Sequence, residues 1–471
     1  MLSTLIAGIV FLFVVVVALH LFRNNPVLVF MFMLAVLTNV GGYFEDISMG
    51  SFLLRDIAFL LSFLIMFVLV PKVNIHDRYF KNFLWFVGLL IFYQIFVSLL
   101  VMNNFSPAKF FGELIDIRLL IFGTLVSIPV YFIVQYDTKT FLKIINYTGL
   151  ILLVLFFLTL FAGIDLMQIS YYDRGMGTGA RRIGMAGLGY ASLMPYIALA
   201  IYLLKVDIEH KKLFYIVGIL TFLSVFITLT RQTNIKYIGG AIILMYFIKA
   251  TLNINIKKLL TGTISLLVVV SVVAELIFPG YLSSFYTIIK LTFLEATGQV
   301  AAGTTQSRTT YEYVAQLPLF LEHPVWGTGL TRIWFTGGQY ERSDIPLLSS
   351  LAIFGIIGFG IYLIQNVIVL KRAFIMRKYN LNHAFVNENA YELVLLFAII
   401  AVQLTGIFFS FFNFGKELVA VNSKLVNGVY LGIFFGLFRK VDLKLYSRMV
   451  QINNNNDEKH TESSGSGTAY R

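Results

Sequence analysis

Long apolar runs separated by short polar loops make up most of the chain. A helix needs about 20 mostly apolar residues to cross the hydrocarbon core of a bilayer. Thirteen segments have this character: 3–22, 26–41, 52–70, 83–102, 118–136, 144–163, 188–204, 213–229, 235–250, 259–278, 346–370, 391–412 and 418–438. The first lacks a basic start and a small-residue cleavage site, so we expect a membrane helix there rather than a cleaved signal peptide. The pattern predicts an all-α polytopic membrane protein.

Two loops are far longer than the others, and both would lie on the same side of the membrane. The first covers 164–187 and the second covers 280–345. Loops of this length are usually functional or disordered, and the aromatic residues spread along the second are enough to pack a small domain. We therefore predict about thirteen transmembrane helices with a partly helical outer cap formed by the large extracytoplasmic loop.

These features divide the chain into six parts. They are N-terminal transmembrane helices (1–163), a Gly/Arg-rich outer loop (164–187), central transmembrane helices (188–279), the large outer loop (280–345), C-terminal transmembrane helices (346–438) and a cytoplasmic tail (439–471). From Gln451 the tail carries an Asn run and a Ser/Gly stretch, a composition typical of disorder.

The composition excludes several other classes of protein. Apolar residues make up 58% of the chain and charged residues 13%, against about 45–50% and about 25% in soluble domains. This balance excludes a soluble enzyme or binding module. The chain has no cysteine, which excludes a disulfide scaffold, a Cys-ligated metal site and a thiol nucleophile.

Lysine and arginine are distributed unevenly between the loops on the two sides of the predicted helices. One set of loops, with the tail, holds 22 of the 36 cations and ten of the 24 acids, so its balance of +12 equals the net charge of the chain. Cytoplasmic loops are enriched in Lys and Arg, which predicts a cytoplasmic C-terminus and, with an odd number of spans, an outer N-terminus. Because the cations are dispersed over short loops, they indicate topology and no nucleic-acid partner.

The outer loops are rich in arginine: they carry nine Arg and five Lys, whereas the inner loops, tail excluded, carry four Arg and twelve Lys. A guanidinium binds phosphate through two parallel hydrogen bonds and tolerates the loss of water better than an ammonium does. An ion pair with an outer acid such as Glu113 explains a single Arg equally well, but the set as a whole favours an anion site. For Arg55 and Arg118, which lie beside Asp56 and Asp116, we expect structural ion pairs.

The segment from Tyr172 to Gly184 is the sharpest candidate for that anion site. Arg174, Arg181 and Arg182 stand beside closely spaced glycines, whose backbone N–H groups can approach an anion. The segment lacks the Gly-Lys-Ser/Thr of a nucleotide-binding loop. A Gly-rich loop also serves as a plain hinge, and that alternative stays open.

Further candidates lie at one helix end and in the large loop. Arg231 is predicted at the outer end of a span, where a cation is costly unless it has a partner or reaches the lipid headgroups. The large loop contains Ser307-Arg308 and, further on, the segment from His323 to Gly329. His323 is the one histidine of six in an outer loop, so we predict no metal site.

Four motifs resemble, in order and topology, those of the O-antigen polymerase/ligase superfamily of inner-membrane glycosyltransferases. They are Arg182-Ile183-Gly184-Met185-Ala186-Gly187 leading to Met194-Pro195; Thr230-Arg231; Ser307-Arg308 followed by His323-Pro324-x-x-Gly327-x-Gly329; and Asp344-Ile345-Pro346-Leu347 with Phe354-Gly355-Ile356-Ile357-Gly358. The likeness covers about 180–360. Ligases of the superfamily carry His where this chain has Asp344, and Gly or Ala often follows the second Arg where this chain has Gln232, which favours a polymerase.

The resemblance implies a metal-independent membrane glycosyltransferase without a cofactor, located in the bacterial cytoplasmic (inner) membrane. It would polymerise undecaprenyl-pyrophosphate-linked oligosaccharide repeat units at the outer face, as in the synthesis of an O-antigen, capsule or exopolysaccharide. The implied partners are the lipid-linked donor and acceptor and the bilayer, with a chain-length regulator left open. A ligase-type transferase and a flippase or other transporter are the alternatives. A transporter usually has mid-membrane polar residues and paired repeats, and a purely structural subunit leaves the outer Arg excess unexplained.

The same resemblance suggests a role for each candidate residue. The residues expected to bind pyrophosphate or sugar are Arg174, Arg181, Arg182, Arg231, Arg308, Tyr172 and Trp326. Asp344 is the expected catalytic base and His323 is its competitor, because an imidazole changes protonation near neutral pH. A salt bridge to Arg342 or Arg332, or a helix cap before Pro346, explains Asp344 about equally well.

Overall fold

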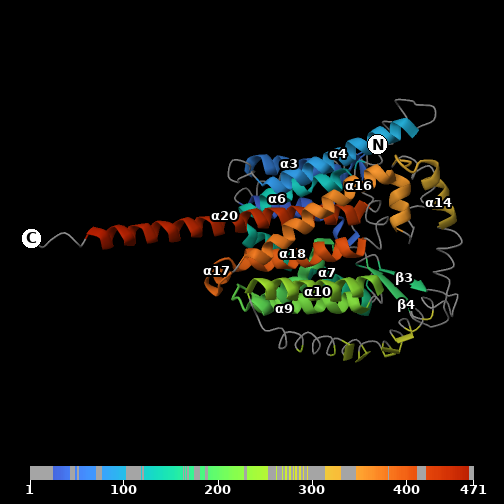
Figure 1. Ribbon diagram of the computed structural model, residues 1–471. Helices are drawn as coiled ribbons and strands as arrows, with labels where there is room; N and C mark the ends of the chain where they lie inside the picture. Colours follow the sequence, from blue (N-terminus) through green and yellow to red (C-terminus); the bar gives the residue numbers. More distant parts are fainter. Residues whose placement is uncertain are drawn as a thin grey trace, which may run out of the picture.

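Helices account for nearly all of the structure in the computed structural model (Figure 1). The model describes residues 25–42, 48–49, 52–69, 77–101, 121–162, 169–173, 181–185, 189–227, 231–252, 313–329, 346–379, 381–410 and 421–465, with isolated positions at 118, 164, 166 and between 261 and 294. The longer helices are α2 (Pro26–Leu37), α3 (Leu54–Leu69), α4 (Arg78–Val101), α6 (Ser127–Tyr136), α7 (Thr138–Ala162), α8 (Met194–Leu204), α9 (Lys211–Ile227), α10 (Arg231–Leu252), α14 (Tyr313–Glu322), α16 (Pro346–Ile375), α18 (Ala390–Ser410) and α20 (Val421–Gly465). The short ones are η1 (Val40–Gly42), η3 (Gly189–Leu193), η5 (Met376–Lys378) and α17 (His383–Glu388).

Four of the described helices are long and apolar enough to cross a membrane, so the prediction of a membrane protein is supported in this coarser form. They are Arg78–Val97, Thr138–Ala162, Ser350–Lys378 and Ala390–Phe408. The shorter apolar helices are Pro26–Leu37, Ile121–Tyr136 and Gly189–Leu204. The described residues thus do not supply the thirteen full-length spans predicted from the sequence. The predicted span 3–22 lies outside them, and 259–278 does so apart from isolated positions.

Backbone breaks explain why several apolar runs give short helices. α2 ends after 12 residues, where Asn39 (φ 50°) and Gly41 (φ 73°) are left-handed. In the run 188–204 the residues Gly189–Leu193 form the 3-10 helix η3, so α8 has only 11 residues and ends, as predicted, before the left-handed Lys205 (φ 55°). A left-handed residue commonly ends a helix, whereas hydropathy averages across it.

Two short antiparallel hairpins correct the all-α prediction. β1 (Ser48–Met49) pairs with β2 (Phe52–Leu53), and β3 (Ile169–Asp173) pairs with β4 (Arg181–Met185). The second hairpin lies in the predicted Gly/Arg-rich loop. Its strands carry Ile and Tyr on either side of a glycine-rich connection, a composition that favours a hairpin.

The centre of the bundle is α18, where all side chains from Leu393 to Ala401 are at most 1% exposed. α20 packs closely on α6 through glycines four residues apart. A Cβ at Gly428 would lie 1.9 Å from the Gly123 carbonyl oxygen, and one at Gly432 would lie 2.6 Å from that of Ser127. Small residues spaced by four let helix backbones approach closely in membranes, so this pair of helices tolerates no side chain at these positions.

Polar loops gather at the two opposite ends of the bundle. At one end, which we call the basic end, ion pairs join loops that the sequence placed on one side of the membrane: Lys139 and Lys143 with Glu209, Lys440 and Lys444 with Glu392, and Arg372 with Asp442. The opposite end, which we call the hairpin end, carries β3, β4 and α14 (Figure 1).

The C-terminal tail differs from its prediction of disorder. α20 continues to Gly465, and Figure 1 shows it leaving the bundle at the basic end. Extending an existing helix adds one hydrogen bond for each residue that becomes ordered, whereas starting a new helix is costly. The tail therefore continues a helix that the bundle has already nucleated, despite its polar composition.

Candidate functional site at the hairpin end

The turn that follows α14 packs its backbone against a break in α16. α16 departs from helical geometry at Gly355 (φ 61°, ψ −175°), inside the apolar span Ser350–Lys378. Backbone hydrogen bonds join the two segments: Thr328 N–H to Ala352 O (2.8 Å), Gly329 N–H to Ile353 O (3.0 Å), Ile356 N–H to Pro324 O (3.0 Å) and Ile357 N–H to Val325 O (3.3 Å). We call this the turn–break contact. It joins 323–329 to 352–358, two of the segments that carry the family resemblance.

Glycine is required on both sides of the turn–break contact. Gly327 has φ 78°, and a Cβ there would lie 2.3 Å from the Ile353 carbonyl oxygen. Gly355 has φ 61°, and its Cβ would lie 2.4 Å from the Val325 carbonyl oxygen. Both backbones are left-handed and both obstacles are main-chain atoms, so any side chain would force the segments apart.

Tyr93 of α4 forms hydrogen bonds to both segments of the turn–break contact. Its hydroxyl is shared between the carbonyl oxygens of Trp326 (2.9 Å) and Phe354 (3.2 Å). A Cβ at Gly358 would lie 2.6 Å from the Tyr93 ring. Little in the sequence indicates this role, because a tyrosine within an apolar run is common and its partners are far away in the chain.

His323 and Trp326 both belong to this turn. His323 follows α14 directly, is half-buried, and its carbonyl accepts a hydrogen bond from Gly327 N–H at 2.7 Å. The backbone of His323 thus helps to build the turn. Trp326 is 47% exposed, so the turn–break contact holds an aromatic ring at the surface of the hairpin end.

The β3–β4 hairpin brings together three more of the predicted residues. In its register Tyr172 pairs with Arg182, and Asp173 pairs with Arg181. The glycine-rich connection, which includes Arg174, lies outside the described residues. An aromatic residue and two arginines thus share one small sheet at the hairpin end.

Arg231 is the first residue of α10. A helix N-terminus offers unpaired backbone N–H groups and a positive dipole end to an anion. α10 is tied to the segment after β4, because the Tyr237 hydroxyl donates to the Ser192 carbonyl at 3.0 Å. Tyr237 also stacks on Tyr196, with ring centroids 5.3 Å apart, and Ser192 hydrogen-bonds Tyr430 of α20. The sequence did not single out these tyrosines, since their hydrogen bonds join four separate segments.

Two of the predicted residues, Arg308 and Asp344, lie outside the described residues. Arg118 has the structural role expected for it: its Nε lies 3.0 Å from both carboxylate oxygens of Asp56. Asp56 is thus one partner of Arg118, and Asp116 lies outside the described residues. In the part of the chain that the structure describes, no three His, Asp or Glu side chains are grouped as a metal site.

Comparison with known proteins finds no family model that matches the chain and no curated protein with significant similarity to it. The class that the fold itself defines is a helical protein in which four of the described helices are long and apolar enough to cross a membrane. A more specific function rests on the residues of the hairpin end.

Proposed function

We propose that this chain is a membrane glycosyltransferase that polymerises oligosaccharide repeat units carried on undecaprenyl pyrophosphate. The observation that carries the proposal is the collection of motif residues at one end of the bundle. The hairpin with Tyr172, Arg181 and Arg182, the α10 N-terminus at Arg231 and the turn with Trp326 all lie at the hairpin end. Arginines suit a pyrophosphate leaving group and aromatic rings suit sugar faces.

In the proposed reaction an acceptor hydroxyl attacks the anomeric carbon of the donor, and the bond from that carbon to the lipid pyrophosphate breaks. Arg182, Arg231 and Arg308 neutralise the charge that develops on the leaving pyrophosphate. Positioning and charge stabilisation of this kind supply most of the rate enhancement in many enzymes. Asp344 accepts the hydroxyl proton, and a positioned base contributes about 10²–10⁴ in rate.

The base has two candidates, and two matched variants distinguish them. Asp344→Asn keeps the size and most hydrogen bonds but removes the basic site. We expect it to abolish polymerisation while thermal unfolding stays unchanged. His323→Gln should keep partial activity, because the contact that His323 makes in the turn uses its backbone carbonyl. Normal polymerisation by Asp344→Asn together with an inactive His323→Gln would reverse the assignment.

The purified protein in detergent tests the proposal against a transporter. Detergent solution has no second compartment, so an enzyme lengthens a lipid-linked sugar chain there and a flippase does not. A gel of envelope glycans from a deletion strain separates the other alternative: single-repeat products indicate a polymerase, and untransferred lipid-linked polymer indicates a ligase.

For the polymerase we propose a bacterial cytoplasmic membrane location, with the hairpin end and the outer cap outside and the C-terminus in the cytoplasm. The chain has no cysteine, so single-Cys variants report directly on topology. An impermeant maleimide should label Thr178→Cys and Ser307→Cys in intact cells, and should label Asn380→Cys only after permeabilisation. The opposite pattern would reverse the orientation.

A further inference from the structure

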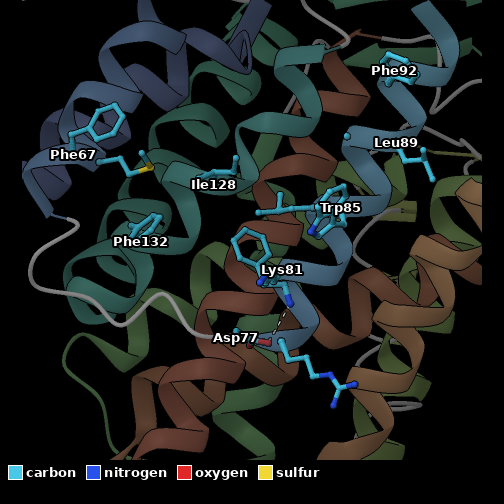
Figure 2. A pocket seen from close by; sticks show the side chains of 13 residues that line it. Phe67, Asp77, Lys81, Trp85, Leu89, Phe92, Ile128 and Phe132 are labelled. Carbon is cyan, nitrogen blue, oxygen red and sulfur yellow. Dashed lines mark hydrogen bonds between the residues drawn. The ribbon is translucent and has the colours of Figure 1, made fainter. Parts of the chain in front are cut away.

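A groove opens on the side of the bundle, along α4. It lies between α3, α4 and α6 and has a volume of about 1240 Å³. Figure 2 shows Phe92, Leu89, Trp85, Lys81 and Asp77 in order along α4, with Phe67 and Phe132 across from them. The groove therefore runs along a membrane-crossing helix toward the basic end.

Most of the groove is apolar and unfilled by the described side chains. Phe67, Trp85 and Phe92 are 63%, 71% and 67% exposed. Gly88 lies between them on α4, and a Cβ there would meet no atom within 4 Å. A long apolar ligand thus finds both an apolar wall and free space at Gly88.

The groove is cationic at the end that lies beside the first turn of α4. Arg78 and Lys81 line it and are exposed, and none of the described residues forms an ion pair with either. Asp77 also lines the groove, but its carboxylate accepts hydrogen bonds from the N–H groups of Tyr79 (2.7 Å) and Phe80 (3.2 Å). The Asp77 carboxylate also lies 3.9 Å from the Arg372 guanidinium. The Asp77 carboxylate thus faces two backbone N–H groups and shares the Arg372 guanidinium with Asp442, and it forms no ion pair with Arg78 or Lys81 among the described residues.

The length of the groove matches one leaflet of a bilayer. Lys81 and Phe92 are eleven residues apart in one helix, which is about 16 Å at 1.5 Å per residue. Half of the hydrocarbon core is about 15 Å. A cation at one end and an apolar wall of this length fit an anionic headgroup with its acyl chain, and they do not fit a purely apolar protein helix.

We infer that the groove binds one anionic glycerophospholipid from the leaflet next to the basic end. Its phosphate lies between Arg78 and Lys81, and an acyl chain runs past Trp85 and Gly88 toward Phe92. The site is distinct from the hairpin end and does not depend on the proposed polymerase activity.

Tryptophan fluorescence provides the test, because Trp85 lines the groove and the chain has only three Trp. The full-length protein with Trp326→Phe and Trp334→Phe keeps Trp85 as the single fluorophore. It is reconstituted in vesicles of phosphatidylglycerol and phosphatidylcholine, with bromine on the acyl chains of one lipid at a time. A cation near the membrane surface favours binding of an anionic lipid by about fivefold. Brominated phosphatidylglycerol should therefore quench Trp85 fluorescence at a severalfold lower mole fraction than brominated phosphatidylcholine.

Two variants and one matched control separate the site from general lipid contact. Arg78→Gln with Lys81→Gln should remove the preference for phosphatidylglycerol. Lys211→Gln with Lys212→Gln removes the same charge from α9, also at the basic end, and should leave that preference intact. Gly88→Leu places a side chain in the free space without a clash at Cβ, and should reduce quenching by either lipid.

Several outcomes would overturn the inference. Equal quenching by both brominated lipids, or equal loss of the preference in the α9 control, would mean ordinary lipid contact or general surface charge. No quenching of Trp85 by either lipid would mean that protein covers the groove, such as a second copy or residues 1–24.

Discussion

Replacing Gly355 by alanine should open the turn–break contact. The new Cβ would lie 2.4 Å from the Val325 carbonyl oxygen and 2.5 Å from the Gly327 nitrogen, at a backbone φ of 61°. A residue other than glycine at φ 61° and ψ −175° costs about 1–3 kcal/mol, and an extra carbon against well-packed atoms costs about 1–3 kcal/mol. Keeping the contact therefore costs about 2–6 kcal/mol in this variant.

Opening the contact loses the four backbone hydrogen bonds that join the segments. Each contributes about 0.5–1.5 kcal/mol in net terms, or about 2–6 kcal/mol together. The strain and the lost bonds are of similar size, so the turn should leave α16 in a large fraction of molecules while the rest of the bundle stays folded.

Maleimide labelling of Thr328→Cys measures this opening. Thr328 is 5% exposed and its hydroxyl donates to the Ala352 carbonyl at 3.1 Å, so a thiol there reacts only when the contact opens. A strain of at least about 2 kcal/mol raises the open population, and the labelling rate, at least about 30-fold. Gly360→Ala is the matched control, because Gly360 lies in the same helix and a Cβ there would meet no atom within 4 Å. Equal labelling rates in the Gly355→Ala and Gly360→Ala backgrounds would refute the reasoning.

Two further predictions concern the arginines and the basic end. Arg→Lys at positions 182, 231 or 308 keeps the charge but loses the two parallel hydrogen bonds to phosphate. Each variant should therefore lose most polymerisation activity at normal expression. Full activity in all three variants would contradict the proposed pyrophosphate site. At the basic end, hydrogen bonds from Lys139 and Lys143 lower the pKa of Glu209 from 4.5 to about 2. The stability that the Glu209 carboxylate contributes is therefore complete above pH 4.5 and is lost as the pH falls toward about 2. The melting temperature of the wild type should approach that of Glu209→Gln over this pH range. A difference in melting temperature that stays constant over the range would contradict the assignment.

The positions of the helices could be predicted from the sequence, whereas their interruptions could not. Apolar runs of the right length gave α4, α7, α16 and α18, because burial in a bilayer acts on the whole run. The break at Gly355 depends instead on a turn near Gly327, about thirty residues earlier in the chain. No local pattern shows that the two will meet.

The candidate site likewise contains residues that the sequence indicates and residues that it does not. Arg181 and Arg182 could be found because arginine beside glycine is unusual on the outer side of a membrane protein. Tyr93 and Tyr237 could not, because each lies in an apolar run and matters only through carbonyl partners on other helices. The ligand contacts of the arginines thus stay predictions, whereas the tyrosines that join the segments around them were missed.

The turn–break contact also bears on the choice between an enzyme and a transporter. Non-helical backbone is tolerated within a membrane where protein or a water-filled cavity satisfies its polar groups, and many transporters leave the backbone of a broken helix free to coordinate ions. Here the carbonyls of Ala352, Ile353 and Phe354 accept hydrogen bonds from the turn and from Tyr93. A break whose carbonyls are already hydrogen-bonded acts as a rigid support for the surface beside Trp326. The geometry thus favours a fixed binding surface at the hairpin end over an ion site at this break, as the proposed polymerase requires.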